Sequence, residues 1–154
     1  LSDYVAPKEL DGKPSGIEDY IGLFAVSGGI GCDEKAAEFE AEHDDYRSIM
    51  LKALADRFAE AFAEALHELV RKQEWGYAPD ENLDNEALIR EKYQGIRPAP
   101  GYPACPEMED RKKIMELLKP ERLGIELSDE LMLNPEQSTD AFVFHHPEAK
   151  YFSV

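Results

Sequence analysis

The longest helical pattern in the chain runs from about Asp44 to Trp75. A helix of roughly 30 residues spans about 45 Å, which is long for a chain of 154 residues. Such a helix must lie across the body of the domain. Its apolar side chains recur at three- and four-residue spacing and fall on one stripe. They are Leu51, Leu54, Phe58, Phe62, Ala65, Leu66 and Leu69.

A second stripe, on the opposite face of this helix, is acidic and consists of Asp56, Glu60, Glu64 and Glu68. Like charges four residues apart destabilise a helix by about 0.2–0.5 kcal/mol per pair. Two interpretations remain open: a solvated face, or a docking surface whose carboxylates accept hydrogen bonds from a partner or cofactor. His67 is expected on this polar face as a surface histidine.

The other periodic segments predict a mixed fold. The apolar run 20–26, closed by glycines, predicts a buried strand. Shorter helices are expected over 85–93 and 107–118, and residues 141–145 are expected to pair with 151–154. We predict an α+β fold in which long helices pack on a twisted, mostly antiparallel sheet. We expect one domain over residues 1–154. The Leu at the start and the strand pattern at the end favour an incomplete fragment of a larger domain.

The charge balance excludes some classes of partner. The chain has 33 acidic and 17 basic residues and a net charge of −16. This excess argues against binding to nucleic acid and to anionic membranes. It either favours a partner with a basic face or only keeps the protein soluble. The sequence has no membrane span or signal peptide, and Cys32 and Cys105 form no disulfide pattern, so we expect a cytoplasmic location.

Other candidate sites are weakly supported. Residues 28–31 follow a strand and precede a helix, but they match neither common phosphate-binding motif. A tight turn is therefore favoured over a phosphate loop. The histidine spacing supports no metal site. Cys105 has no orienting partner in the sequence for a catalytic role.

The strongest local signal is the segment 95–106, which contains four prolines. Prolines at this density hold the backbone near polyproline II and leave its carbonyl and N–H groups open to a ligand. Gly101 permits close approach of the backbone, or a positive φ. Arg97 offers a planar fork suited to a carboxylate, and Tyr102 offers a flat ring with a hydroxyl. The residues predict a rigid loop for carboxylate, amide and aromatic recognition.

The stretch Arg97-Pro-Ala-Pro-Gly-Tyr-Pro-Ala-Cys-Pro106 is nearly identical to one in cobalamin-dependent methionine synthase. The whole chain resembles the C-terminal, S-adenosylmethionine-binding activation domain of that family. Further matching segments occur in the same order at 20–26, 43–46, 52–64, 75–79, 93–97, 146–147 and 150–151.

The resemblance implies a role in methionine biosynthesis. In this family of homocysteine S-methyltransferases, cobalamin that has oxidised to inactive cob(II)alamin is remethylated. S-adenosylmethionine donates the methyl group, and flavodoxin or a related flavoprotein donates an electron. The expected cofactors are therefore S-adenosylmethionine and cobalamin, the latter held by a neighbouring cobalamin-binding module that docks onto this domain. The fragment alone is not expected to be catalytic, and no residue is assigned as acid, base or nucleophile.

The resemblance also assigns residue roles. Asp56 and Glu60 match acidic residues that face the cobalamin module. Phe152 departs from the family, where a tyrosine stands at this position, and the family uses a further acidic residue upstream of the region matching Leu1. The expected S-adenosylmethionine-binding residues are Arg97, Ala99, Gly101, Tyr102, Tyr151 and Phe152.

Two other functions differ in what they require of this sequence. A non-enzymatic docking module would keep the fold while its ligand site had lapsed. A stand-alone methyltransferase is disfavoured, because the glycine-rich strand–turn–helix that such enzymes use is not found in the sequence.

Overall fold

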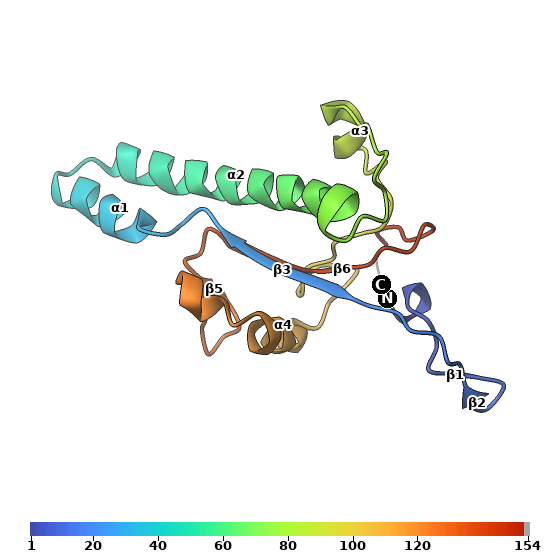
Figure 1. Cartoon of the computed structure of the whole chain (residues 1–154). Helices are drawn as coiled ribbons and strands as arrows, with labels where there is room; N and C mark the ends of the chain where they lie inside the picture. Colours follow the sequence, from blue (N-terminus) through green and yellow to red (C-terminus); the bar gives the residue numbers. More distant parts are fainter. Residues whose placement is uncertain (153–154) are drawn as a thin grey trace.

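The computed structural model describes residues 1–152, and its centre is a two-stranded antiparallel sheet with helices on both faces (Figure 1). Strand β3 (Gly22–Ser27) pairs along its whole length with β6 (Ser138–Val143). Helix α2 (Asp45–Leu69) crosses one face of this pair, and α4 (Arg111–Leu118) lies against the other. This arrangement confirms the predicted α+β fold.

The remaining elements are short and surround this centre. Helix α1 packs beside the first half of α2, and the β1–β2 hairpin extends away from the body (Figure 1). Helix α2 passes directly into a π-helical turn at Val70–Glu74, so the long helical pattern is confirmed. The others are η1 (Ser2–Tyr4), β1 (Glu9–Leu10), β2 (Lys13–Pro14), α1 (Cys32–Ala41), α3 (Asn85–Ile89), η3 (Met108–Asp110), η4 (Pro120–Leu123), β4 (Glu126–Leu127) and β5 (Leu133–Asn134).

Small residues on α2 allow it to approach the sheet closely. Ala55, Ala59 and Ala63 are buried, and Ala63 packs in the core that β3 and β6 form. At the end of β3, a Cβ on Gly28 would lie only 2.4 Å from the carbonyl oxygen of Ala55. Only glycine fits at such a distance. The glycine run at 28–31 therefore forms a close-packed turn between β3 and α1.

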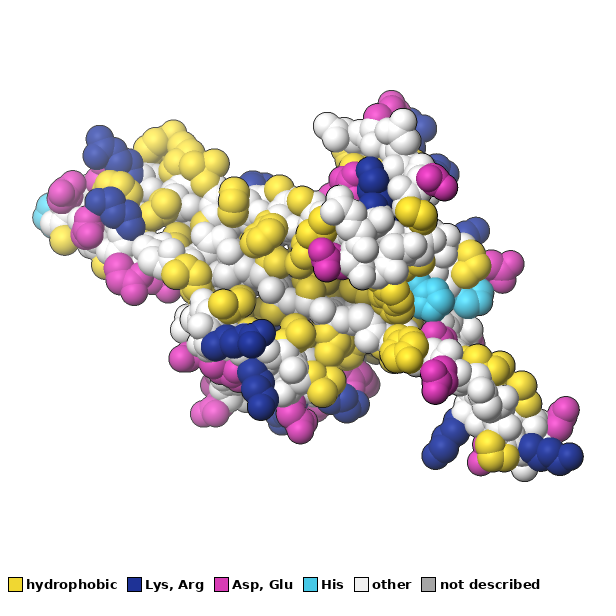
Figure 2. All heavy atoms as spheres, viewed as in Figure 1, with side chains coloured by type: hydrophobic (Ala, Val, Ile, Leu, Met, Phe, Trp, Pro, Cys, Tyr) yellow, Lys and Arg dark blue, Asp and Glu magenta, His cyan; other side chains and the backbone are white. Residues whose placement is uncertain are grey.

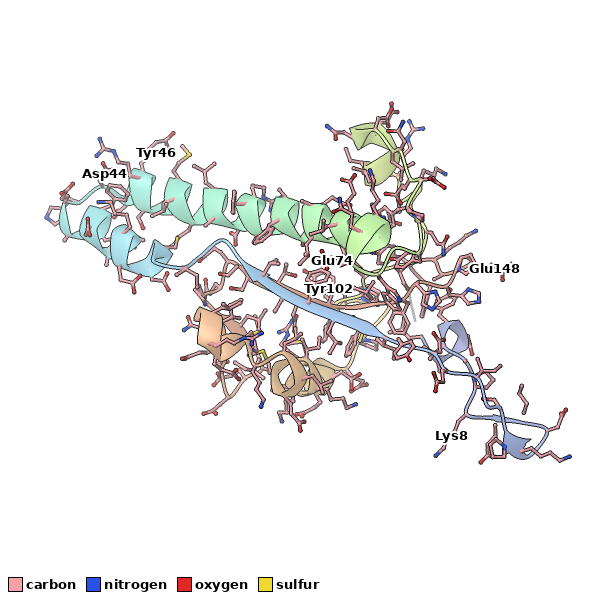
Figure 3. The ribbon with its side chains drawn as sticks, in the orientation of Figure 1. Lys8, Asp44, Tyr46, Glu74, Tyr102 and Glu148 are labelled. Carbon is pink, nitrogen blue, oxygen red and sulfur yellow. The ribbon has the colours of Figure 1, made fainter. Side chains whose placement is uncertain are left out.

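Much of the apolar stripe of α2 faces away from the sheet. Phe58 is 64% exposed and Phe62 is 45% exposed, whereas the alanines one position further along the helix are buried. Hydrophobic side chains accordingly lie on the outer surface of α2 in Figure 2, and Tyr46 points away from the body in Figure 3. An apolar stripe is typical of a core-facing surface. Here the core takes the smaller alanine stripe, because the helix lies so close to the backbone of β3.

The predicted pairing of residues 141–145 with 151–154 is wrong. Ala141 and Val143 pair with β3 instead, because they complete a core with Phe24 and Val26. Tyr151 and Phe152 lie outside any strand, and residues 153–154 lie outside the described part of the chain.

Residues 1–152 contain neither a candidate membrane span nor a candidate metal site. Within residues 1–152, no helix combines the length and the low polarity that a membrane span requires. In the same part of the chain, no three His, Cys, Asp or Glu side chains gather in a way that could hold a metal ion. Cys32 and Cys105 are both buried as free thiols.

Candidate functional site

The proline-rich loop is fastened to the edge of strand β6. Ile96 forms an antiparallel bridge with Phe144, and the two residues exchange backbone hydrogen bonds of 3.0 and 2.9 Å. Two residues further on, the carbonyl oxygen of Pro98 accepts a hydrogen bond from the N–H of Phe142 at 3.0 Å. The loop therefore continues the sheet without being a strand, as its prolines require.

A buried ion pair supports the loop from below. The Arg111 guanidinium donates to the Asp140 carboxylate through Nε, at 3.1 and 3.2 Å. It also donates to the backbone carbonyls of Leu131 and Pro100, at 2.6 and 3.2 Å. Asp140 is fully buried, and this burial raises the pKa of its carboxyl even though Arg111 acts to lower it. One arginine thus joins α4, β6 and the loop.

Gly101 turns the loop, as predicted. Its φ of +91° lies in the region that favours glycine, and a Cβ there would lie 2.3 Å from Sδ of Met108. The N–H of Gly101 donates to the carbonyl of Cys105 at 2.8 Å, which closes a compact turn.

The expectation that the loop leaves its carbonyls open is wrong for six of them. The oxygens of Ile96, Tyr102 and Cys105 accept hydrogen bonds from the N–H groups of Phe144, Cys105 and Gly101. The Pro98, Ala99 and Pro100 oxygens accept hydrogen bonds from Phe142, Tyr102 and Arg111. The loop is rigid because the protein itself satisfies these acceptors. The Ala99 N–H, by contrast, has no hydrogen-bond partner among the described residues, so it remains a free donor beside the pocket.

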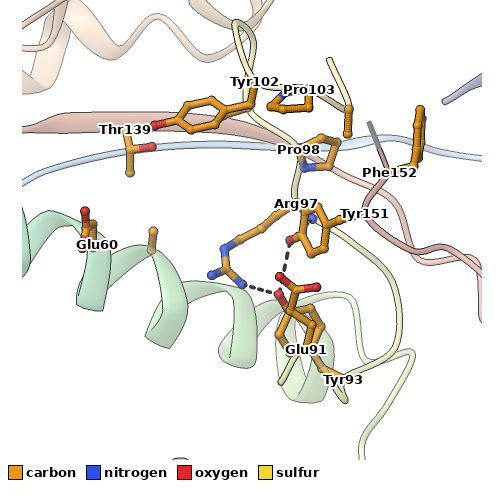
Figure 4. Close-up of a pocket in the computed structure, with 13 residues that line it drawn as sticks. Glu60, Glu91, Tyr93, Arg97, Pro98, Tyr102, Pro103, Thr139, Tyr151 and Phe152 are labelled. Atoms are coloured by element: carbon orange, nitrogen blue, oxygen red, sulfur yellow. Dashed lines mark hydrogen bonds between the residues drawn. The ribbon is translucent and has the colours of Figure 1, made fainter. Parts of the chain in front are cut away.

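A pocket of about 530 Å³ opens between this loop, α2 and the segment after α3 (Figure 4). It brings together most of the residues that the sequence predicts for a site. Gly101 and Asp56 do not line it: Gly101 shapes the loop from behind, and Asp56 lies one turn before Glu60 on α2. The predicted residues in its wall are Glu60, Arg97, Ala99, Tyr102, Tyr151 and Phe152.

Outside the proline-rich loop, four residues of the wall were not predicted from the sequence: Ala63, Glu91, Tyr93 and Thr139. Glu91 and Tyr93 follow the short helix α3, in a stretch without a motif of its own. The only signal was that the segment 93–97 resembles the activation-domain family. Thr139 belongs to β6 and faces the pocket because of its register opposite Val26.

Arg97 lies at the head of the pocket, and both its backbone N–H and its guanidinium form hydrogen bonds with neighbouring side chains. Its N–H donates to the Tyr151 hydroxyl at 2.9 Å. Its guanidinium donates to the Glu64 carboxylate, with Nη2–Oε2 at 2.6 Å and Nη1–Oε1 at 3.3 Å. Nη1 also lies 3.0 Å from Nδ1 of His67 and 3.2 Å from the hydroxyl of Tyr93.

Electrostatics around Arg97 favour its charged form. Burial acts to lower the pKa of Arg97, whereas Tyr93, Tyr151 and Glu64 raise it, and the net shift is upward. Burial also raises the pKa of Tyr93, so this phenol stays protonated. The guanidinium at this end of the pocket therefore stays protonated, and it is paired with the Glu64 carboxylate.

His67 is not the surface residue that was predicted. It is fully buried and packs edge-on against the ring of Tyr93, with 5.0 Å between ring centroids. Burial, Arg71 and Arg97 together lower the pKa of His67 from 6.5 to about 2. The ring is therefore neutral at physiological pH. The segment after α2 folds back and covers this helix face, which periodicity within α2 could not reveal.

The chemistry of the wall defines the ligand class. Arg97 suits a carboxylate, the carboxylates of Glu60 and Glu91 suit a cation, and Tyr102 and Phe152 offer faces to a flat ring system. The fold and the pocket define an α+β domain whose pocket wall combines a guanidinium, two carboxylates and aromatic side chains.

Comparison with known proteins identifies the family. The model of the vitamin B12-dependent methionine synthase activation domain matches residues 1–154. A crystal structure of the MetH reactivation domain bound to AdoHcy (S-adenosylhomocysteine) is similar, with a TM-score of 0.90 and 57% sequence identity. The chain belongs to the methionine synthase activation-domain family. The match covers 99% of this chain and 46% of that structure's chain, so the chain spans about half the length of that relative.

Proposed function

We propose that this chain binds S-adenosylmethionine in the pocket headed by Arg97 and presents its methyl group for the reductive remethylation of cobalamin. The observation that carries the proposal is the position of the Arg97 guanidinium in a pocket of about 530 Å³. That volume suits a ligand of nucleoside-plus-amino-acid size. The related reactivation domain is bound to S-adenosylhomocysteine, the product that remains after methyl transfer.

The amino-acid end of the ligand is assigned to the Arg97 end of the pocket. A guanidinium and a carboxylate form strong, charge-assisted hydrogen bonds. The free N–H of Ala99, two residues along the loop, is a second donor for the same end. Tyr151 helps to fix the position of Arg97. Its hydroxyl accepts a hydrogen bond from the Arg97 backbone N–H and lies 3.2 Å from the Tyr93 hydroxyl, which itself contacts the guanidinium.

The sulfonium of S-adenosylmethionine needs negative charge nearby. Glu60 and Glu91 supply two carboxylates to the wall, and Arg97 is the one cationic side chain among the described residues of this wall. Loss of the methyl group turns the sulfonium into a neutral thioether, so these carboxylates favour the methyl donor over the product. Tyr102, which is 65% exposed, would cover the adenine ring.

The second half of the proposed function is docking. Asp56 and Glu60 lie on the pocket side of α2, one turn apart and exposed to solvent. They would face the cobalamin-binding module when it delivers its cofactor to the pocket. Cobalamin supplies the methyl acceptor, a flavoprotein such as flavodoxin supplies the electron, and this chain orients the donor.

A calorimetric titration tests the proposal. S-adenosylmethionine and S-adenosylhomocysteine are titrated separately into the full chain, with adenosine as the control ligand. Both should bind at one site per chain, and more tightly than adenosine, because only they reach Arg97. If neither binds while the chain is folded by circular dichroism, the proposal fails and the docking module with a lapsed site is the better description.

A further inference from the structure

We propose that Glu64 and His67 are positioning residues: they hold one side of the Arg97 guanidinium so that its Nε/Nη2 edge is presented to the ligand's carboxylate. The inference rests on the proposed function, since it concerns how the same pocket receives a carboxylate. It adds two residues outside the pocket wall, and it specifies which edge of the arginine the ligand uses.

The hydrogen-bond donors of Arg97 are unevenly used. A guanidinium has five N–H donors: one on Nε and two on each of Nη1 and Nη2. Nη1 meets three acceptors, namely Glu64 Oε1, His67 Nδ1 and the Tyr93 hydroxyl. Nη2 meets only Glu64 Oε2. Among residues 1–152, the Nε–H and the second Nη2–H have no hydrogen-bond partner.

These two free donors lie on the same edge. In a planar guanidinium, Nε–H and one Nη2–H point in parallel, and this edge can receive both oxygens of a carboxylate. Glu64 occupies the neighbouring Nη1/Nη2 edge in the same bidentate manner. Two carboxylates can therefore share one arginine without displacing each other. Figure 4 shows the Arg97 guanidinium directed toward α2, with Tyr93 on one side and Glu60 on the other.

His67 can perform this task only in one protonation state. Arginine has donors alone, so Nδ1 of His67 must accept, and the ring proton must be on Nε2. That proton faces the Tyr77 hydroxyl, whose oxygen lies 3.4 Å from Nε2. The groups that face the ring from the surrounding elements are Arg71, Arg97, Tyr77 and Tyr93. Two of these are cations, so the neutral ring is strongly favoured.

Glu64 is the more exposed member of the pair. Its side chain is 32% exposed, and that of Arg97 is 20% exposed. Replacing Glu64 by glutamine keeps the shape but places an N–H₂ donor against an Nη donor. The two-point contact is then lost, and the long arginine side chain is free to turn its open edge away from the pocket.

The test compares a ligand that carries a carboxylate with a ligand that lacks one. S-adenosylhomocysteine and 5′-methylthioadenosine share the thioether and the adenosine, but only the first has the amino-acid end. In the full chain, Glu64→Gln should weaken binding of S-adenosylhomocysteine about tenfold and that of 5′-methylthioadenosine less than twofold. Glu68→Gln is the matched control, because it removes the same charge one turn along α2, where the one ion pair of Glu68 among the described residues is with Lys72. It should change neither affinity more than twofold.

Each other outcome has a defined meaning. Unchanged or tighter binding of S-adenosylhomocysteine by Glu64→Gln would overturn the inference, with Glu64 then acting as a competitor for Arg97. If the wild-type chain does not bind S-adenosylhomocysteine, the proposed function itself fails. If it binds and Arg97→Ala abolishes binding while Glu64→Gln does not weaken it, only the positioning role fails.

A second measurement is independent of the ligand. The ¹⁵N chemical shifts of the His67 ring in the full chain report which nitrogen carries the proton. We expect a neutral ring protonated on Nε2 between about pH 6 and 8. A ring protonated on Nδ1, or on both nitrogens, would overturn the role of His67 as an acceptor for Arg97.

Discussion

Arg97→Ala should lower the affinity of the chain for S-adenosylmethionine by about a hundredfold. Removing one partner of a buried, hydrogen-bonded charge pair costs about 2–5 kcal/mol, and every 1.4 kcal/mol is a factor of ten in affinity. The Arg97 side chain is four-fifths buried, and in the proposed complex its free edge receives the ligand's carboxylate. Calorimetry with wild type and variant measures the ratio directly.

The control for this variant is Arg90→Ala. Arg90 pairs with Glu86 on exposed α3 and does not line the pocket around Arg97. Like Arg97→Ala, the variant Arg90→Ala removes one positive charge from the protein. Its affinity for S-adenosylmethionine should stay within about twofold of wild type. Equal affinity of Arg97→Ala and wild type would show that the ligand's carboxylate does not use this arginine.

Arg111→Met should lower the free energy of unfolding by about 3–5 kcal/mol. That is the range for breaking a buried ion pair by removing one partner, which leaves the other uncompensated. Asp140 is fully buried and has Arg111 as its only ion-pair partner among the described residues. The carbonyls of Leu131 and Pro100 lose a donor as well. Urea denaturation followed by circular dichroism measures the difference.

Two further variants serve as controls for the effect of Arg111→Met on stability. Lys112→Met removes a positive charge from the next position of α4, where it forms an exposed pair with Glu109. Its effect should stay within about 1 kcal/mol. The double variant Arg111→Met with Asp140→Leu removes both buried charges and should recover part of the lost stability. A loss below 1 kcal/mol for Arg111→Met would contradict the role of this ion pair in holding the loop.

Periodicity predicted the helix α2 because three- and four-residue spacing is a property of the sequence itself. It could not predict which stripe meets the sheet. Phe58 and Ala59 are neighbours in sequence, yet the larger residue is exposed and the smaller one is buried. The choice follows from the close approach of α2 to Gly28, which is a contact between segments about 30 residues apart.

The strand pair was predicted incorrectly for a similar reason. Residues 141–143 alternate as a strand should, but nothing in a local pattern names the partner strand. The nearest candidate in sequence was 151–154, whereas the actual partner is β3, more than 110 residues earlier. Long-range pairing depends on which apolar faces complete a common core, here Phe24 and Val26 with Val143.

The candidate site was predicted in part. Arg97 and Tyr102 lie in one rigid loop, and their own chemistry pointed to them directly, whereas Ala99 of the same loop was found only through resemblance. Tyr151 was found only through resemblance, because its hydroxyl reaches Arg97 across more than 50 residues of sequence. His67 was placed on the surface, because the residues that bury it, including Tyr93, come from outside its own helix.

The central claim is that the pocket headed by Arg97 receives S-adenosylmethionine, and a crystal structure of the chain with this ligand tests it most directly. The account predicts the ligand's carboxylate on the Nε/Nη2 edge of Arg97, with Glu64 still on the Nη1/Nη2 edge. It places the adenine against Tyr102 and Phe152. A ligand bound elsewhere on the chain, or bound in this pocket with its carboxylate away from Arg97, would contradict it.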